Sequence, residues 1–325
     1  MMYKAYFHLN RSPFELTPDP SCFVPTKHHD EALASLYYGV RRHKGLVVVT
    51  GEVGTGKTLL LRSLVHLLEQ SKDVAYAYFF NSTLTPTEFL QYAVSDFGLN
   101  ASGKNKCELL TELSKFLIAR GSRQLTTVLI VDEAHLLSAE TLEEIRLLSN
   151  LETTTEKLLQ IMLVGQPELD EKLDSVGLRQ LKQRIALRTQ LKPLSAEETK
   201  SYVEKRLRIA GADPAEPPLF SSYALEKIHR YSQGLPRLIN TLCENALITA
   251  YARRLANVTG EIIEDIAIDF RLDVAGSAHI SDMKLRDIDG SRHTPASEIA
   301  PFPAFRASVA STALPKAPTA REEEL

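Results

Sequence analysis

The sequence predicts an α/β protein: a three-layer α/β/α domain built on a parallel sheet, followed by a small all-α domain and a disordered tail. Three observations support this prediction. Short apolar runs alternate with amphipathic stretches, the strand-like runs stop near Pro193, and hydrophobic periodicity fades beyond Gly276. Strands that alternate with helices are typical of a parallel sheet covered by helices on both faces.

Five segments have the length and apolar character of buried strands. They are Leu46–Thr50, Val74–Phe80, Val128–Val131, Leu159–Val164 and, with a weaker pattern, Ile185–Leu191. Strands of a buried parallel sheet read as unbroken apolar runs, and two of these segments show that pattern. Between the runs stand helix start signals: Thr85 and Glu88 form a capping box, and Ser138 precedes an amphipathic stretch.

The chain divides into three predicted parts. Residues 1–194 form the sheet domain and residues 195–275 the all-α domain, which begins at a capping box formed by Ser195 and Glu198. Its helical patterns cover about 195–210, 222–233, 236–253 and 259–270. Residues 276–325 are rich in Pro, Ala and Ser and end in an acidic run, which is typical of a disordered tail.

The composition excludes several classes of protein. Among 325 residues, 38 are Lys or Arg and 41 are Asp or Glu, so the formal charge of −3 gives no overall argument for a nucleic-acid coat. The three cysteines are far apart, which favours a reducing compartment over a disulfide framework. The sequence contains no run of 18 apolar residues, the length that would indicate a membrane span. We therefore expect a cytoplasmic protein that reaches a membrane only through a partner.

The segment after the first predicted strand matches the phosphate-binding pattern G-x-x-x-x-G-K-[ST] and opens a predicted helix, which is the context this motif requires. Its glycines allow backbone N–H groups to hold phosphate oxygens, and the helix N-terminus favours negative charge. We therefore predict a nucleotide site formed by Gly51, Glu52, Val53, Gly54, Thr55, Gly56, Lys57, Thr58 and Leu59. Lys57 would reach the β- and γ-phosphates, and the Thr58 hydroxyl would bind Mg²⁺.

The predicted strand Val128–Val131 ends in two carboxylates, Asp132 and Glu133. Asp132 would hold Mg²⁺, and Glu133 would act as general base on the attacking water. The run Asp-Glu-Ala-His also occurs in helicases, but a helicase of that kind needs two sheet domains and this chain has room for one. His135 is therefore interpreted as an ordinary residue of the loop after the strand.

Three further positions are candidates for the same site. Gln166 follows the strand Leu159–Val164, where it would sense the γ-phosphate or orient the water, or simply end the strand before Pro167. Arg184 is the first candidate for an arginine that a neighbouring subunit supplies to the phosphoryl group, and Arg179 the second. Arg237, beside the start of a helix, would reach the nucleotide across the domain boundary. A solvated surface role remains open for each arginine.

These motifs together resemble the AAA+ ATPases: GEVGTGKT, LIVDEAH, LVGQPEL, LRQLKQRI and GLPRLIN. The opening FHLNRSPFELTPDPSCFVPTKHHDEALASLYYGV is similar to the ExeA/GspA-type ATPases of bacterial general secretion, and the resemblance covers about residues 5–272. The TniB/TnsC transposition ATPases and the origin-recognition ATPases look like more distant relatives of the same shape.

The resemblance implies an ATP- and Mg²⁺-dependent oligomer, a ring or filament. It implies Walker roles for Lys57, Thr58, Asp132 and Glu133, with Gln166 as first sensor, Arg184 as finger and Arg237 as second sensor. It also implies that the segment around Phe14, Pro18 and Tyr37 packs near the adenine, although these side chains are equally well explained as core. Two departures are Gln166 in place of the commoner Asn, and a polar tail where the secretion ATPases usually continue into a membrane helix.

Three functions are compatible with this pattern. The first is an ATP-hydrolysing motor acting on a secretion, pilus or exopolysaccharide-export assembly, with an envelope-complex protein as partner. The second, less favoured, is an ATP-dependent DNA-binding switch, which needs a basic stripe formed by clusters such as residues 41–44, 205–208 and 253–254. The third is an ATP-binding regulator with negligible turnover, which the intact Glu133 argues against.

Overall fold

The computed structural model describes residues 2–15, 24, 26–80 and 84–272, so the predicted tail lies outside the described residues. Five strands form one parallel sheet in the order β2-β3-β4-β1-β5. Their bounds are β1 Leu46–Gly51, β2 Val74–Phe79, β3 Thr126–Val131, β4 Gln160–Gly165 and β5 Ile185–Leu191. All five predicted strands are therefore confirmed, each within two residues of its expected bounds.

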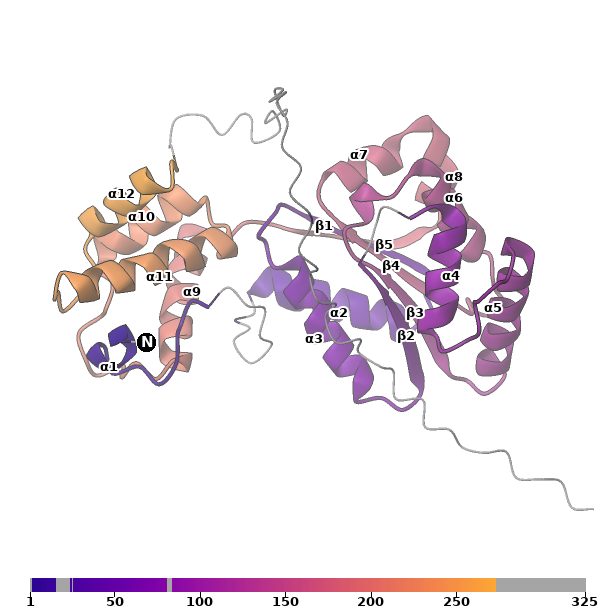
Figure 1. Ribbon diagram of the computed structural model, residues 1–325, viewed down its shortest axis with the longest axis horizontal. Coiled ribbons are helices and arrows are strands. Elements are labelled where there is room, and N and C mark those ends of the chain that lie inside the picture. The colour runs from indigo at the N-terminus through magenta and orange to yellow at the C-terminus, as the bar shows by residue number, and fades with distance from the viewer. Residues whose placement is uncertain (1, 16–23, 25, 81–83, 273–325) are drawn as a thin grey trace, which may run out of the picture.

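Helices cover both faces of this sheet (Figure 1). On one face, α2 (Lys27–Arg41) and α3 (Lys57–Glu69) pack against Val47 and Val49 of β1. Leu46 and Val48 point to the other face because side chains alternate along a strand. That face is covered by α4 (Pro86–Asp96), α5 (Lys106–Gly121), α6 (Ala139–Leu148), α7 (Glu168–Asp174) and α8 (Arg179–Lys182). The result is the three-layer arrangement that the alternating pattern predicts.

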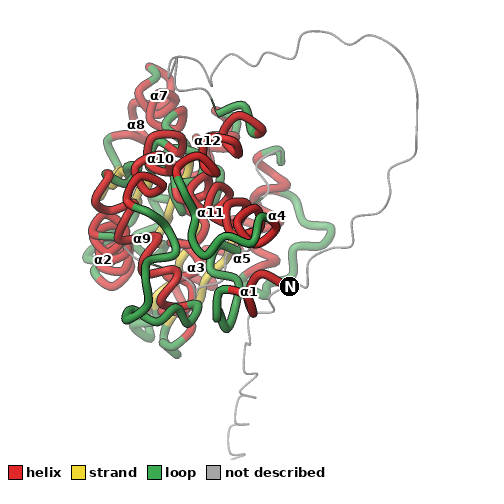
Figure 2. The backbone as a smooth tube through the Cα atoms, turned by 90° about the vertical axis from the view of Figure 1, so that its left-hand side faces the viewer, coloured by secondary structure: helices red, strands yellow, loops and turns green. Residues whose placement is uncertain are grey.

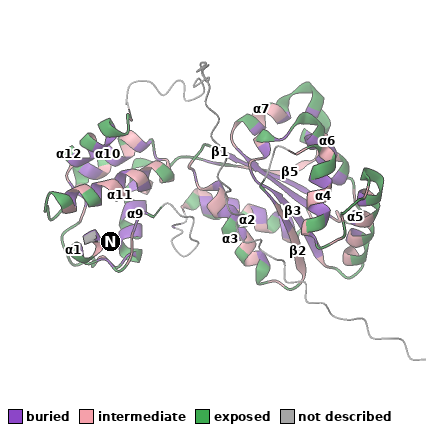
Figure 3. Cartoon of the chain, viewed as in Figure 1, coloured by how far each residue is buried: buried purple, intermediate pink, exposed green. Residues whose placement is uncertain are grey.

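The weak strand signal over residues 185–191 matches the low burial of β5 (Figure 3). Every residue of β1, β3 and β4 is buried, so these strands are apolar along most of their length. Residues of β5, at one edge of the sheet, alternate between partly buried and exposed, and only Leu191 is fully buried. An edge strand has fewer neighbours to exclude water, which accounts for the weaker pattern over Ile185–Leu191.

The helix starts follow the capping signals. Thr85 accepts from the Glu88 N–H while Glu88 accepts from the Thr85 N–H, and Ser195 and Glu198 make the same pair of bonds. Ser138 caps α6 by accepting from the Thr141 N–H at 3.2 Å. Each cap satisfies N–H groups that have no partner within the helix.

A second group of helices packs around its own core. It comprises α9 (Ala196–Ile209), α10 (Ser222–Ser232), α11 (Pro236–Ala252) and α12 (Gly260–Asp269). These helices lie beside the sheet in Figure 1 and in front of it in Figure 2. The division into residues 1–194 and 195–275 stays a prediction, but the N-terminal residues pack with the helices and not with the sheet. Helix α1 (Met2–Tyr6) contributes Tyr3, and Phe7 and Phe14 complete the same core.

No helix in the described part of the chain is both long and apolar enough to cross a bilayer.

Candidate nucleotide-binding site

The glycine-rich loop connects the end of β1 to the start of α3, and two of its glycines are required by its shape. Gly54 and Gly56 have φ angles of 84° and 97°, in the region that glycine adopts without strain. A Cβ on Gly54 would lie 3.0 Å from the Cβ of Arg237, and one on Gly56 would lie 2.9 Å from the His29 ring. The loop therefore packs tightly on its outer side and keeps its backbone close to whatever it holds.

Lys57, the first residue of α3, is only 6% exposed. Its ammonium donates to the carbonyl oxygens of Gly51 at 2.8 Å and Glu52 at 3.0 Å. Burial lowers the pKa of Lys57, and the nearby carboxylates of Glu133 and Asp132 oppose that shift. The ammonium is thus held inside the loop, beside backbone N–H groups at the N-terminus of α3 that have no partner within the helix. This combination fits a polyphosphate.

Asp132 follows β3 directly and lies opposite Thr58 of α3. The Thr58 hydroxyl is 3.4 Å from Asp132 Oδ2, and the Tyr78 hydroxyl donates to the same oxygen at 2.9 Å. Burial raises the pKa of Tyr78, so its phenol stays protonated as a donor. A hydroxyl and a carboxylate are the hard oxygen ligands that Mg²⁺ prefers, with phosphate oxygens completing the site. No cluster of three His, Cys, Asp or Glu residues suited to a metal occurs among the described residues.

Glu133 adopts a left-handed backbone conformation, with φ of 51°, and its N–H donates to Asp132 Oδ1 at 2.9 Å. Its buried Oε2 makes no hydrogen bond and lies 3.4 Å from His135 Nδ1. A non-glycine residue in this conformation stores strain, which is common at functional sites. The tight turn after β3 therefore leaves one buried Glu133 oxygen without a hydrogen bond, next to the His135 ring.

His135 lies in the short turn after β3, as the sequence predicts, and its ring contacts the end of the neighbouring strand. Its Nδ1 faces both Glu133 Oε2 and the backbone N–H of Gln166, which lies 3.4 Å away. Its carbonyl accepts from Lys172 Nζ at 2.5 Å. Burial lowers the pKa of His135, which favours the neutral ring. The imidazole therefore connects the end of β3 to the end of β4, where Gln166 follows the strand beside β1.

Arg237 lies at the start of α11, next to the glycine-rich loop. Its N–H donates to the Gly54 carbonyl at 3.2 Å, while its side chain is exposed. Pro236 occupies the first helical position, as the sequence predicts. The second group of helices thus contacts the loop directly, and the Arg237 side chain leaves the backbone beside the glycine-rich loop.

Arg184 directly precedes β5, at the amino ends of the strands, whereas the glycine-rich loop lies at their carboxyl ends. In the register of β1 and β5, Ile185 pairs with Leu46, whereas Leu191 pairs with Gly51 at the loop. At about 3.3 Å per residue, Arg184 is roughly 20 Å from the loop of its own chain. It lies near Glu152, whose pKa is lowered by the bond from Lys157 and further by Arg184. Arg179 is exposed at the start of α8. Arg184 therefore lies outside the site of its own chain.

Two aromatic residues of the opening segment lie in the core, which is one of the two readings that the sequence left open for them. Phe14 is fully buried against Phe220 in the helical core, with ring centroids 6.0 Å apart, and Tyr37 packs on the α2 face of the sheet. Pro18 lies outside the described residues. A small pocket beside the loop is instead lined by Val24, Thr26, His29, Thr55, Gly56, Leu59, Tyr202, Arg206 and Pro236. Val24, Thr26 and His29 belong to the opening segment that the resemblance places near the adenine, whereas Tyr202 and Arg206 were not predicted at this pocket.

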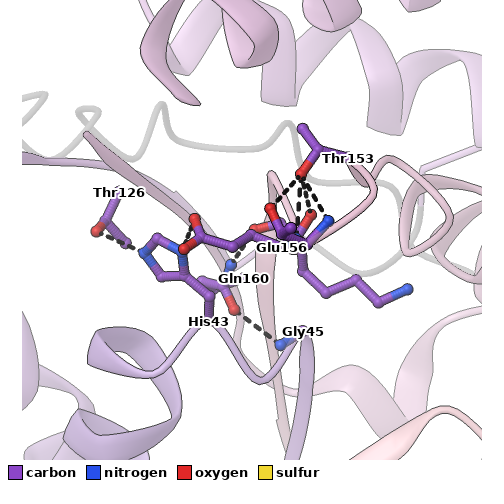
Figure 4. Close-up of polar contacts among 8 residues, drawn as sticks. His43, Gly45, Thr126, Thr153, Glu156 and Gln160 are labelled. Carbon is purple, nitrogen blue, oxygen red and sulfur yellow. Dashed lines mark hydrogen bonds and ion pairs between the residues drawn. The ribbon is translucent and has the colours of Figure 1, made fainter. Parts of the chain in front are cut away.

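A polar groove lies at the amino ends of the strands, away from the loop, and Figure 4 shows its main contacts. His43 Nδ1 is 3.1 Å from Glu156 Oε2 and its Nε2 is 3.1 Å from Thr126 Oγ1. The Gly45 N–H donates to Gln160 Oε1 at 2.7 Å. The basic segment 41–44 is therefore bonded into the base of the sheet domain through His43.

Comparisons with known proteins identify the kind of domain that carries these residues. The model of the family described as "AAA domain" matches residues 40–173, which contain the loop, Asp132 and Gln166. General secretion pathway protein A of Aeromonas hydrophila is 42% identical over 253 residues. That match covers 78% of this chain and 45% of the relative, so the chain spans less than half the length of the protein it matches.

Solved structures share the fold at low sequence identity. The ORC2 protein of Aeropyrum pernix in its ADPNP–ADP complexes has a TM-score of 0.56 and 16% identity, covering 80% of this chain and 72% of that chain. Cdc6p of Pyrobaculum aerophilum has a TM-score of 0.60 and 18% identity, covering 79% and 70%. The chain therefore carries an AAA domain with the P-loop fold of the AAA+ proteins, and over most of its length it is related to General secretion pathway protein A.

Proposed function

We propose that the chain binds ATP with Mg²⁺ and hydrolyses it at the glycine-rich loop. The observation that carries this proposal is the meeting of Lys57, Asp132 and Glu133 at one edge of the sheet. Lys57 is buried inside the loop, Asp132 lies 3.4 Å from the Thr58 hydroxyl, and Glu133 keeps a carboxylate oxygen without a hydrogen bond.

The residues have distinct roles in this proposal. Lys57 and the loop N–H groups bind the β- and γ-phosphates, and Thr58 and Asp132 hold the metal. When bound, Mg²⁺ neutralises charge that develops on the phosphate oxygens. Glu133 accepts a proton from the attacking water. The turn in which the Glu133 N–H donates to Asp132 holds Glu133 in place.

Gln166 and Arg237 complete the site from two sides. Gln166 follows β4, which pairs with the loop strand β1, and this position supports a role in which its amide contacts the γ-phosphate or the attacking water. Arg237 lies where the helical part of the chain contacts Gly54. Arg184 lies at the amino ends of the strands, away from the loop of its own chain, and serves the site of a neighbouring subunit in a ring or filament.

We further propose that turnover drives assembly or remodelling of a secretion, pilus or exopolysaccharide-export system through an envelope-complex protein. This process rests on the relationship to General secretion pathway protein A. The protein would act in the cytoplasm and reach the inner membrane through that partner.

The DNA-binding alternative has weaker support. In each of the three basic clusters, one arginine is engaged inside the chain: Arg41 with Asp73, Arg206 with the Pro13 carbonyl, and Arg253 with Asp265. Two of the similar structures are of origin proteins with DNA, but they share at most 20% identity with this chain and support the fold alone.

Two variants test the proposed activity. Lys57→Ala removes the cation that meets the phosphates, and we expect ATP affinity by isothermal titration to fall about 100-fold. Glu133→Gln keeps the shape of the site but removes the base. It should bind ATP with near wild-type affinity and lose about 10²–10⁴ in turnover. Unchanged affinity in the first variant, or near wild-type turnover in the second, would contradict the assigned roles.

A further inference from the structure

The first turn of α2 reaches the glycine-rich loop through one buried histidine. His29 is 4% exposed, and its Nε2 lies 2.8 Å from the carbonyl oxygen of Thr55. Its Nδ1 lies 2.7 Å from the hydroxyl oxygen of Thr26, the residue that caps α2. The ring therefore connects a helix cap on one side to the loop on the other.

The partners of the ring fix its tautomer. A carbonyl oxygen can only accept a hydrogen bond, so Nε2 carries the hydrogen and donates to Thr55. Nδ1 then accepts from the Thr26 hydroxyl. Burial lowers the pKa of His29, in agreement with a neutral ring. A neutral imidazole with a fixed Nε2–H is a directional donor. A charged side chain buried at the same position would cost free energy.

The bond to Thr55 also determines where the next N–H points. In a trans peptide the carbonyl and the following N–H point in opposite directions, and no cis peptide occurs among the described residues. Because His29 holds the Thr55 carbonyl on the outer side of the loop, the Gly56 N–H is turned to the inner side. The φ of 97° at Gly56 and the 2.9 Å from its would-be Cβ to His29 Nε2 show how closely ring and loop fit.

We propose that His29 is a positioning residue of the phosphate site, whose Nε2–H sets the Thr55–Gly56 peptide so that the Gly56 N–H faces a bound phosphate. The proposal rests on the proposed ATP site. It differs from a helix-capping role, in which only the contact between Nδ1 and Thr26 matters. The two contacts use different ring nitrogens, so they can be removed separately.

Two amide substitutions separate these contacts. His29→Gln places an N–H donor near the position of Nε2 and lacks a group at Nδ1, whereas His29→Asn places a polar group near Nδ1 and cannot reach Thr55. We expect His29→Asn to weaken Mg²⁺–ATP binding about tenfold by isothermal titration, and His29→Gln to stay within about threefold of wild type. A capping role alone predicts the opposite order, and that order would overturn the proposal.

Controls separate this inference from the proposed function. His66→Ala changes an exposed histidine of α3 that bonds to Gln70, and ATP affinity should not change. Thermal melting without nucleotide shows whether each variant is folded. If the wild type binds ATP in a Lys57-dependent manner while both His29 variants bind equally well, only the role of His29 is overturned. If Lys57→Ala binds as tightly as wild type, the proposed site and the His29 inference both fail.

Discussion

Tyr78 is a residue whose effect on the site is indirect but specific. Its hydroxyl donates to Asp132 Oδ2 at 2.9 Å, the same oxygen that lies 3.4 Å from the Thr58 hydroxyl. Carboxylates that bind metals are commonly oriented by such outer hydrogen bonds, and their loss weakens metal binding. Tyr78 comes from β2 and Asp132 from the end of β3, so the neighbouring strand holds the proposed Mg²⁺ ligand in place.

We predict that Tyr78→Phe raises the Mg²⁺ concentration needed for half-maximal ATP turnover about tenfold, because Asp132 loses its fixed orientation. The measurement is a Mg²⁺ titration at saturating ATP. Tyr76→Phe is the matched control, since Tyr76 lies on the same face of β2 but its hydroxyl donates to Glu69 at the end of α3. An unchanged Mg²⁺ requirement in Tyr78→Phe would show that Asp132 is held by its other contacts.

The sequence predicted the positions of the loop residues, Asp132 and Glu133 because each stands directly at a strand end, and parallel strands bring their carboxyl ends together. Tyr78, His29 and His135 were not predicted as site residues. Their contacts depend on strand register, on the entry of α2 and on a tight turn, none of which leaves a pattern in a single sequence. The roles of the predicted site residues stay predictions.

At the scale of whole elements, apolar runs and caps predicted the strands and helices, but they did not predict the order of the sheet. Any buried parallel strand reads as an apolar run, whichever neighbours it has. In the structure β4 lies between β1 and β3, with Gly165 beside Thr50 and Leu163 beside Val131. This order brings Gln166, at the end of β4, between the glycine-rich loop and Asp132.

The cap of α9 allows a prediction that tests an element without touching the site. Ser195→Ala removes the side chain that accepts from the Glu198 N–H, and should lower stability by about 1 kcal/mol. We expect the melting temperature to fall by about 2–4 °C while ATP affinity stays the same. Ser201→Ala, inside the same helix, is the control and should cause little change. A fall of similar size in both variants would argue against the cap.

At the scale of the whole molecule, the N-terminal residues belong with the last helices. Tyr3 donates to Glu244 of α11 at 2.6 Å, and Arg206 Nε donates to the Pro13 carbonyl at 2.6 Å. Apolar residues in a sequence predict burial but not which core they join, which is why this packing was not predicted. The first and the last described residues therefore belong to one helical unit, and the residues of the sheet lie between them in the sequence.

The placement of Arg184 predicts that turnover depends on assembly. Per-subunit ATP turnover should rise with protein concentration in the wild type, whereas Arg184→Ala should stay about 10³–10⁵ below the assembled wild type. Arg179→Ala is the comparison that identifies the finger. A mixture of Arg184→Ala and Glu133→Gln subunits should regain turnover, because each supplies the group that the other lacks. An Arg184→Ala variant at the wild-type rate would contradict a finger at this position.

Arg184 and the glycine-rich loop lie at opposite ends of the strands. This separation makes every proposed assembly directional. Under the arrangement in trans, each subunit is a donor on one side and a recipient on the other, so an open chain of subunits has two unlike tips. One tip always retains a site that lacks its donor, and closure into a ring removes that deficit. A copy that lacks Arg184 would then stop catalysis in the neighbour it serves, whereas a copy that lacks Glu133 would stop catalysis only in itself, so the two defects act at different places along the assembly.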